Sequence, residues 1–156
     1  MSNRARKGGA RPGVVSYATT HHVRDNCLCL HVQRAARALA RRFDDALRPL
    51  ALTQGQFSLL MSLNRPEPPL IGDVASLLAM DRTTLTANLK PLERRGLVEV
   101  RRDEADRRGR RLTLTAEGRA LLLAAVPVWT RTHAESEALL TRSSADTLRG
   151  ALQELC

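Results

Sequence analysis

The region 71–114 begins with apolar residues that recur at helical spacing. Four of them lie at positions i, i+3, i+4 and i+7, which predicts a helix of about two turns with one apolar stripe. Met80 and Asp81 interrupt this pattern, so the helix should end before them. The members of the stripe are Ile71, Val74, Ala75 and Leu78.

A second helix is predicted from Arg82 to about Arg95. Asp81 is a suitable N-cap, because its carboxylate can accept hydrogen bonds from the free N–H groups of the first turn. Gly96 is suited to end the helix. The residues expected on its buried face are Leu85, Leu89 and Leu92.

The opposite face of this second helix carries small, hydroxyl-bearing and cationic side chains, as expected for about 100° of rotation per residue. Short side chains permit close approach to a DNA major groove, where hydroxyl and ammonium groups can bind base edges or phosphates. We therefore expect this helix to read DNA. The face consists of Thr83, Ala87, Lys90 and Arg94, with Thr84 and Thr86 on its flanks.

Two short strands are predicted at 97–100 and 112–114, joined by the basic loop 101–111. Helix, turn, helix and a hairpin with arginines at its tip is the pattern of a winged helix–turn–helix. Arginine is favoured in a narrow minor groove because the potential is most negative there. We expect the wing to reach the minor groove beside the major groove that the second helix enters.

Helices are also predicted on both sides of this module, each with an N-capping residue. Pro66 limits the helix before the module, and Pro127 is expected to kink the long helix after it. The predicted caps are Asp25 or Asn26, Thr53 with Gln56 as a capping box, Thr115, and Ser143 or Ser144.

The predicted fold is mostly α with a small β-hairpin wing. Residues 1–24 form a disordered basic tail, 53–114 the winged helix–turn–helix module, and 25–52 with 115–156 a helical dimerisation region. Apolar stripes on the outer helices favour a homodimer about a two-fold axis. Two reading helices would then lie about 34 Å apart, so the partner should be double-stranded DNA with a pseudo-palindromic operator.

The charge of +9, from 25 Lys and Arg against 16 Asp and Glu, points to a polyanionic partner. Aromatic residues make up only 3% of the chain, which argues against reading single-stranded bases by stacking. The sequence has neither a long apolar run nor a secretory signal, so no membrane partner and a cytoplasmic location are expected. It also lacks the common catalytic and cofactor-binding motifs, so neither enzymatic activity nor a cofactor is expected.

Several motifs in this order resemble the MarR family of bacterial transcriptional regulators, over about Cys29 to Trp129. The resemblance implies a mostly helical homodimer that usually represses nearby genes and releases DNA when a small molecule or an oxidant arrives. It also implies that Asp106 orients Arg108 for the minor groove. The motifs are Ile71-Gly72-Asp73-Val74-Ala75, Asp81-Arg82-Thr83-Thr84-Leu85-Thr86, Leu92-Glu93-Arg94-Arg95-Gly96-Leu97-Val98, Asp106-Arg107-Arg108 and Leu112-Thr113-Leu114-Thr115-Ala116-Glu117-Gly118.

The candidate DNA contacts lie on the second helix and the wing. The alternative to DNA binding is a winged module that binds protein, in which the basic face serves only solubility. The tail 1–24 is either a solvated segment or a basic arm on phosphates. The candidate contacts are Arg82, Thr83, Thr84, Thr86, Ala87, Lys90, Arg94, Asp106, Arg107, Arg108 and Arg110.

Cys27, Cys29 and His31 do not form a convincing metal site, because helical residues i and i+2 point about 200° apart. Cys29 has two interpretations: a buried structural thiol, or a redox sensor near a helix N-terminus. The resemblance includes a peroxide-sensing branch in which a cysteine at this place is oxidised. That branch holds the thiolate with two tyrosines, whereas this sequence has Gln33 and Phe43.

Overall fold

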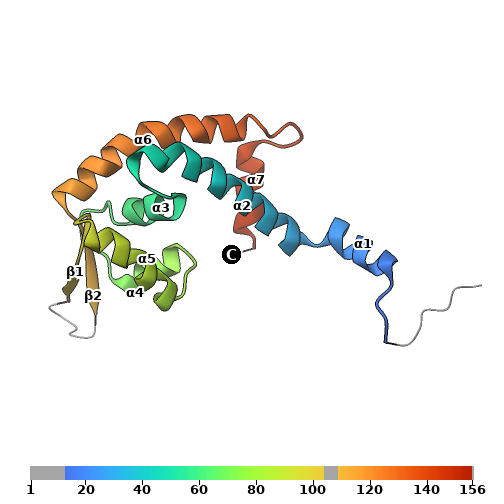
Figure 1. Cartoon of the computed structure of the whole chain (residues 1–156), viewed down its shortest axis with the longest axis horizontal. Coiled ribbons are helices and arrows are strands. Elements are labelled where there is room, and N and C mark those ends of the chain that lie inside the picture. The colour runs from blue at the N-terminus through green and yellow to red at the C-terminus, as the bar shows by residue number, and fades with distance from the viewer. Residues whose placement is uncertain (1–12, 104–108, 156) are drawn as a thin grey trace, which may run out of the picture. The chain divides into compact units, whose positions relative to one another are not determined.

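The computed structural model describes residues 13–103 and 109–155, and these confirm a mostly helical fold with one two-stranded antiparallel hairpin (Figure 1). No helix within these ranges is long and apolar enough to cross a membrane. The elements are α1 (Tyr17–Asn26), α2 (Leu28–Leu47), the 3-10 turn η1 (Arg48–Leu50), α3 (Gln54–Ser62), α4 (Ile71–Leu77), α5 (Arg82–Arg94), β1 (Val98–Arg102), β2 (Arg110–Leu114), α6 (Ala116–Glu137) and α7 (Ala145–Gln153).

The predicted apolar stripes of α4 and α5 are buried in one core. Leu85 and Leu92 are fully buried, Leu89 is 2% exposed, and Val74 of α4 lies in the same cluster. Burying one such side chain stabilises the fold by about 1.5–3 kcal/mol relative to leaving it exposed, so the three leucines fix which side of α5 faces outward. The helix packs against α4, α3 and β1.

The buried core is shared by the winged module and the long helix that follows it. Leu122 and Ala125 of α6 belong to the same buried cluster as α5, and α3 packs on both α6 and the α4–α5 pair. By its contacts the chain splits into two compact units, residues 1–38 and 39–156. The long helix after the wing is therefore part of the compact body that holds the winged module.

The hairpin has a register that pairs Val98 with Leu114 and Val100 with Leu112. Its apolar face is buried against the core at Val98, Leu112 and Leu114. The segment before α4 extends this small sheet, because the Leu112 N–H donates to the Pro69 carbonyl at 3.0 Å. The wing is thus attached to the chain that leads directly into α4.

Most helix starts are capped as the sequence predicts. Thr53 and Gln56 form the capping box of α3, the Asp81 carboxylate accepts from the Thr84 N–H, and the Thr115 hydroxyl accepts from the Gly118 N–H. Of the two candidates for the last helix, Ser144 is the cap. Gly96 has φ +68°, a left-handed conformation that favours glycine, and it follows the end of α5.

The prediction for the N-terminal segment is wrong in two respects. Residues from Tyr17 onward form α1 rather than a disordered tail, because the Ser16 hydroxyl accepts from the Thr19 N–H at 3.2 Å and caps a helix there. Asp25 and Asn26 do not cap α2, since both lie at the end of α1. At the start of α2 the Cys27 sulfur takes this place, because it accepts a hydrogen bond from the Leu30 N–H at 3.5 Å.

Aromatic and charged side chains connect α3, α6 and α7. Trp129 stacks on His133 with ring centroids 4.6 Å apart, and its other contact is with Phe57 of α3 at 6.2 Å. Arg149 of α7 donates to the Glu137 carboxylate at 2.7 Å, and this bond holds the pKa of Glu137 below its usual value. Trp129 therefore lies half-buried between α3 and His133.

Candidate nucleic-acid interface

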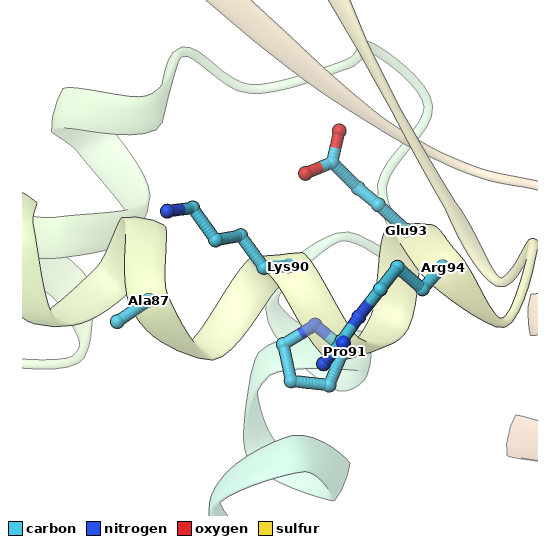
Figure 2. Close-up of a pocket in the computed structure, with 5 residues that line it drawn as sticks. All are labelled: Ala87, Lys90, Pro91, Glu93 and Arg94. Atoms are coloured by element: carbon cyan, nitrogen blue, oxygen red, sulfur yellow. The ribbon is translucent and has the colours of Figure 1, made fainter.

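The outward face of α5 has the composition that the sequence predicts. Thr83, Ala87, Lys90 and Arg94 are all exposed, and they lie opposite the buried leucines of the same helix. Figure 2 shows Lys90 and Arg94 extending from α5 beside a shallow hollow that is also lined by Ala87, Pro91 and Glu93. Neither cation has an ion-pair partner among the residues that the structure describes. This face is therefore cationic and open.

Asp81 and Thr84 join in a two-bond cap at the start of α5. The Thr84 hydroxyl donates to one carboxylate oxygen at 2.6 Å, and the Thr84 N–H donates to the other at 2.8 Å. These bonds, the hydroxyl bond above all, lower the pKa of Asp81 from its usual value. The Thr84 oxygen keeps lone pairs with which to accept a bond from DNA.

Thr86 and Arg82 are also constrained by their surroundings. Thr86 is exposed, and its hydroxyl donates to the Arg82 carbonyl at 2.7 Å, which leaves the oxygen lone pairs as acceptors. The Arg82 guanidinium lies against Gly72 of α4, where an added Cβ would be 3.1 Å from Nη2. The absence of a side chain at Gly72 allows this close approach.

Arg95, which follows α5, donates hydrogen bonds to the backbone of another part of the chain. Its Nη1 donates to the Ala51 carbonyl at 2.6 Å and its Nη2 to the Leu50 carbonyl at 3.5 Å. These carbonyls belong to the turn that ends α2 and η1. Arg95 therefore ties the end of α5 to the segment before α3.

The wing arginines divide into two groups that the sequence did not distinguish. Arg101 pairs with Glu99 at 2.5 Å, and Arg111 pairs with the buried carboxylate of Asp103 at 3.2 Å. By contrast, Arg102 is exposed and lies directly across the hairpin from Arg110. Alternation along the strands places Arg102 and Arg110 on the same hairpin face as Val100 and Leu112.

Sequence reasoning did not select Arg102 as a DNA contact, although the strand register would have paired it with the predicted Arg110. Arg110 donates through Nη1 to the Gly109 carbonyl at 3.1 Å. The predicted contacts Asp106, Arg107 and Arg108 lie outside the described residues. Of the predicted contacts, those on α5 and Arg110 of β2 belong to the described part of the winged module.

Cys29 is exposed and is the second residue of α2, where the Gln33 amide donates to its sulfur at 3.2 Å. Cys27 is half-buried between the two helices. Within the described parts of the chain, no group of three or more His, Cys, Asp or Glu side chains is arranged to hold a metal ion. The buried interpretation of Cys29 does not fit this chain's structure.

Two helices in a helix–turn–helix, followed by a hairpin on the same core, define a winged helix–turn–helix protein. The profile of the MarR family matches residues 52–109. The organic hydroperoxide resistance transcriptional regulator of Bacillus subtilis is 30% identical over 108 residues, which cover 69% of this chain and 74% of that protein. The chain belongs to the MarR family of transcriptional regulators, which are not enzymes.

Similar solved structures include two that contain DNA. The M. tuberculosis regulator MosR, in complex with DNA, has 38% identity and a TM-score of 0.76, covering 83% of this chain and 93% of that chain. The repressor CouR, bound to a 23-mer duplex, has 31% identity and a TM-score of 0.75, covering 85% and 94%.

The regulator TtmR of Methylorubrum extorquens is 37% identical over 97 residues, or 62% of this chain. The chain spans only 50% of the length of TtmR.

Proposed function

We propose that this protein is a sequence-specific regulator, most simply a repressor, that binds double-stranded DNA as a homodimer. The observation that carries the proposal is the open cationic face of α5, held outward by three buried leucines. In this arrangement Thr83, Ala87 and Lys90 meet bases or nearby phosphates in the major groove. The solved relatives MosR and CouR, each with DNA, support this placement.

The wing supplies the second contact, in the adjacent minor groove. Arg102 and Arg110 face each other across the strands, and like charges in such a pair repel each other. The sequence places Arg107 and Arg108 further out on the same loop, with Asp106 orienting Arg108. A phosphate backbone beside the hairpin would attract these arginines, because it is negatively charged along its whole length.

A homodimer is supported by apolar side chains left exposed on the outer helices. Leu148 and Leu152 of α7 are 40% and 38% exposed, and Leu39 of α2 is 43% exposed. Exposed leucines at helical spacing favour burial against another copy, whose symmetry matches a pseudo-palindromic operator. Light scattering should give twice the monomer mass, and Leu152→Asp should shift it toward monomer and weaken DNA binding.

DNA binding is tested by fluorescence anisotropy on a duplex of about 30 base pairs at several salt concentrations. A logarithmic affinity that falls steeply with logarithmic salt, with a slope of about −0.9 per phosphate contact, would support the proposal. Binding that is absent or insensitive to salt would favour a winged module that binds protein. Lys90→Ala should weaken binding, whereas Arg142→Ala, a loop residue between α6 and α7, removes the same charge and should not.

Release from DNA is proposed to follow either thiol oxidation or binding of a small molecule. Oxidation is supported by the exposed Cys29 thiol and by the similarity to a regulator of organic hydroperoxide resistance. A hydroperoxide ROOH would convert the thiol to sulfenic acid, R′SOH, and leave as the alcohol ROH. Peroxide should release the wild type but not Cys29→Ser, with Cys27→Ser as the matched control. Failure of peroxide to release the wild type would instead favour a small-molecule effector.

A further inference from the structure

Asp103 is a buried carboxylate that follows the exposed Arg102 at the end of β1. It directly follows β1, is 7% exposed, and donates its N–H to the Gly109 carbonyl at 3.1 Å. Its two carboxylate oxygens accept from Nε and Nη2 of Arg111, both at 3.2 Å. The ion pair therefore closes the described part of the hairpin at its outer end.

The same guanidinium also reaches outside the hairpin. Nη1 of Arg111 donates to the Pro68 carbonyl at 2.8 Å, and Arg111 forms a β-bridge with Leu70. Leu70 is the N-cap residue of α4. One side chain therefore joins the end of β1, the start of β2 and the segment that leads into the helix–turn–helix.

These side-chain contacts orient the outer end of the hairpin relative to the segment before α4, which the hydrogen bonds between β1 and β2 alone do not do. Strand pairing fixes β1 against β2, and the buried face fixes the base of the hairpin near Val98 and Leu114. A buried ion pair contributes little net stability compared with an apolar pair, but the planar fork of arginine has a fixed geometry. The natural role for such a pair is to set where the outer end of the wing lies.

We infer that Asp103 and Arg111 are positioning residues that hold the outer end of the wing in register with α4 and α5 for DNA. This inference rests on the proposed DNA binding. Neither side chain is assigned a DNA contact, since the Arg111 guanidinium is committed to Asp103 and Pro68. Arg102 and Arg110 form the rung of the hairpin between Asp103 and Arg111, so their direction depends on this ion pair.

Asp103→Asn tests the inference because two explanations predict opposite results. Removing a negative charge from a DNA-binding surface should strengthen binding if only net charge matters. If Asp103 positions the wing, the variant should bind a duplex of about 30 base pairs about tenfold more weakly. Glu99→Gln is the matched control, because it removes the same charge from an exposed ion pair of the same hairpin and should bind as well as the wild type or better.

The salt dependence separates positioning from a general loss of folded protein. Fewer folded molecules would lower the affinity by one factor at every salt concentration and leave the slope unchanged. A displaced wing binds fewer phosphates, so the slope should become shallower by about 0.9 for each phosphate that the variant no longer neutralises. Arg111→Lys keeps the charge but not the fork, and it should reproduce the shallower slope if Asp103→Asn does not fold.

The outcomes that would overturn the inference are distinct from failure of the proposed function. Wild-type affinity and slope in both Asp103→Asn and Arg111→Lys, with thermal melting confirming that they fold, would overturn the positioning role alone. A wild-type protein that shows no salt-dependent binding to duplex DNA would overturn the proposed function, and the inference with it.

Discussion

The Thr84 hydroxyl donates to the Asp81 carboxylate at 2.6 Å, so the residue predicted to face DNA also completes the cap of its own helix. The cap and the predicted DNA contact therefore share one side chain. A substitution at Thr84 would change both, whereas Thr83 interacts with the cap only through its backbone and its side chain lies on the exposed face.

The charge of Asp81 should stabilise the fold in a pH-dependent way. Its folded pKa lies below the ordinary value of 3.8, mainly because of the Thr84 hydroxyl bond. The stabilisation is therefore fully present above 3.8 and is lost as the pH falls below that value through the folded pKa. Asp81→Asn retains a capping side chain but not the charge. Urea midpoints of the two proteins should differ at neutral pH and converge in acid. A constant difference across this range would contradict the expectation.

Leu85→Ala and Thr83→Ala should separate stability from DNA binding on neighbouring faces of α5. Leu85 is fully buried, so its truncation should cost about 2–5 kcal/mol of unfolding free energy. Thr83 is exposed, and its truncation should change stability by less than about 0.5 kcal/mol while it weakens DNA binding. Urea unfolding and anisotropy measure the two quantities. A stability loss for Thr83→Ala as large as that for Leu85→Ala would place Thr83 inside the core.

Gly118→Ala should destabilise the protein because the start of α6 lies too close to the chain before β1. An added Cβ at Gly118 would overlap the Leu97 carbonyl oxygen, a backbone atom that cannot rotate away. Overpacking of this kind costs about 1–3 kcal/mol or more. Gly150→Ala is the control, since nothing lies within 4 Å of its added Cβ and alanine is the better helix former. Thermal melting should therefore move in opposite directions for the two variants.

Lys90 and Arg108 should contribute differently to DNA binding. A phosphate contact by Lys90 predicts that Lys90→Ala lowers affinity almost evenly for all sequences and makes the salt slope shallower by about 1. A minor-groove contact by Arg108 predicts a loss of about 1–3 kcal/mol for Arg108→Ala. Anisotropy on operator and random duplexes distinguishes these effects. Unchanged affinity after Arg108→Ala would remove Arg108 from the predicted interface.

Local chemistry made most of the helices predictable. The caps at Thr53, Asp81, Thr115 and Ser144 follow from hydroxyl or carboxylate side chains before an apolar pattern. The break between α1 and α2 was missed, because Asp25 and Asn26 are better capping residues than Cys27 by type. The start of α2 is set by where α1 ends, and the sequence pattern did not indicate that α1 exists.

The roles of the wing arginines depended on contacts between distant parts of the chain. The sequence placed Arg101, Arg102, Arg110 and Arg111 at the two ends of one basic loop, and only Arg110 of these four was predicted to contact DNA. Strand register separated Arg102 from Arg101, and the Pro68 carbonyl, 43 residues earlier, defined the role of Arg111. A cluster of charged residues in the sequence therefore predicts that an interface exists more reliably than it predicts which of those residues contact the partner.

The bonds from Arg95 to the Ala51 and Leu50 carbonyls couple the end of α5 to the turn after α2. A guanidinium fixed at the far end of α5 prevents that helix from sliding along its own axis independently of the turn after α2. Any rearrangement that shifts this turn must either move α5, the helix proposed to read DNA, or break the Arg95 bonds. A movement in the body would therefore change the position of α5 relative to the proposed groove.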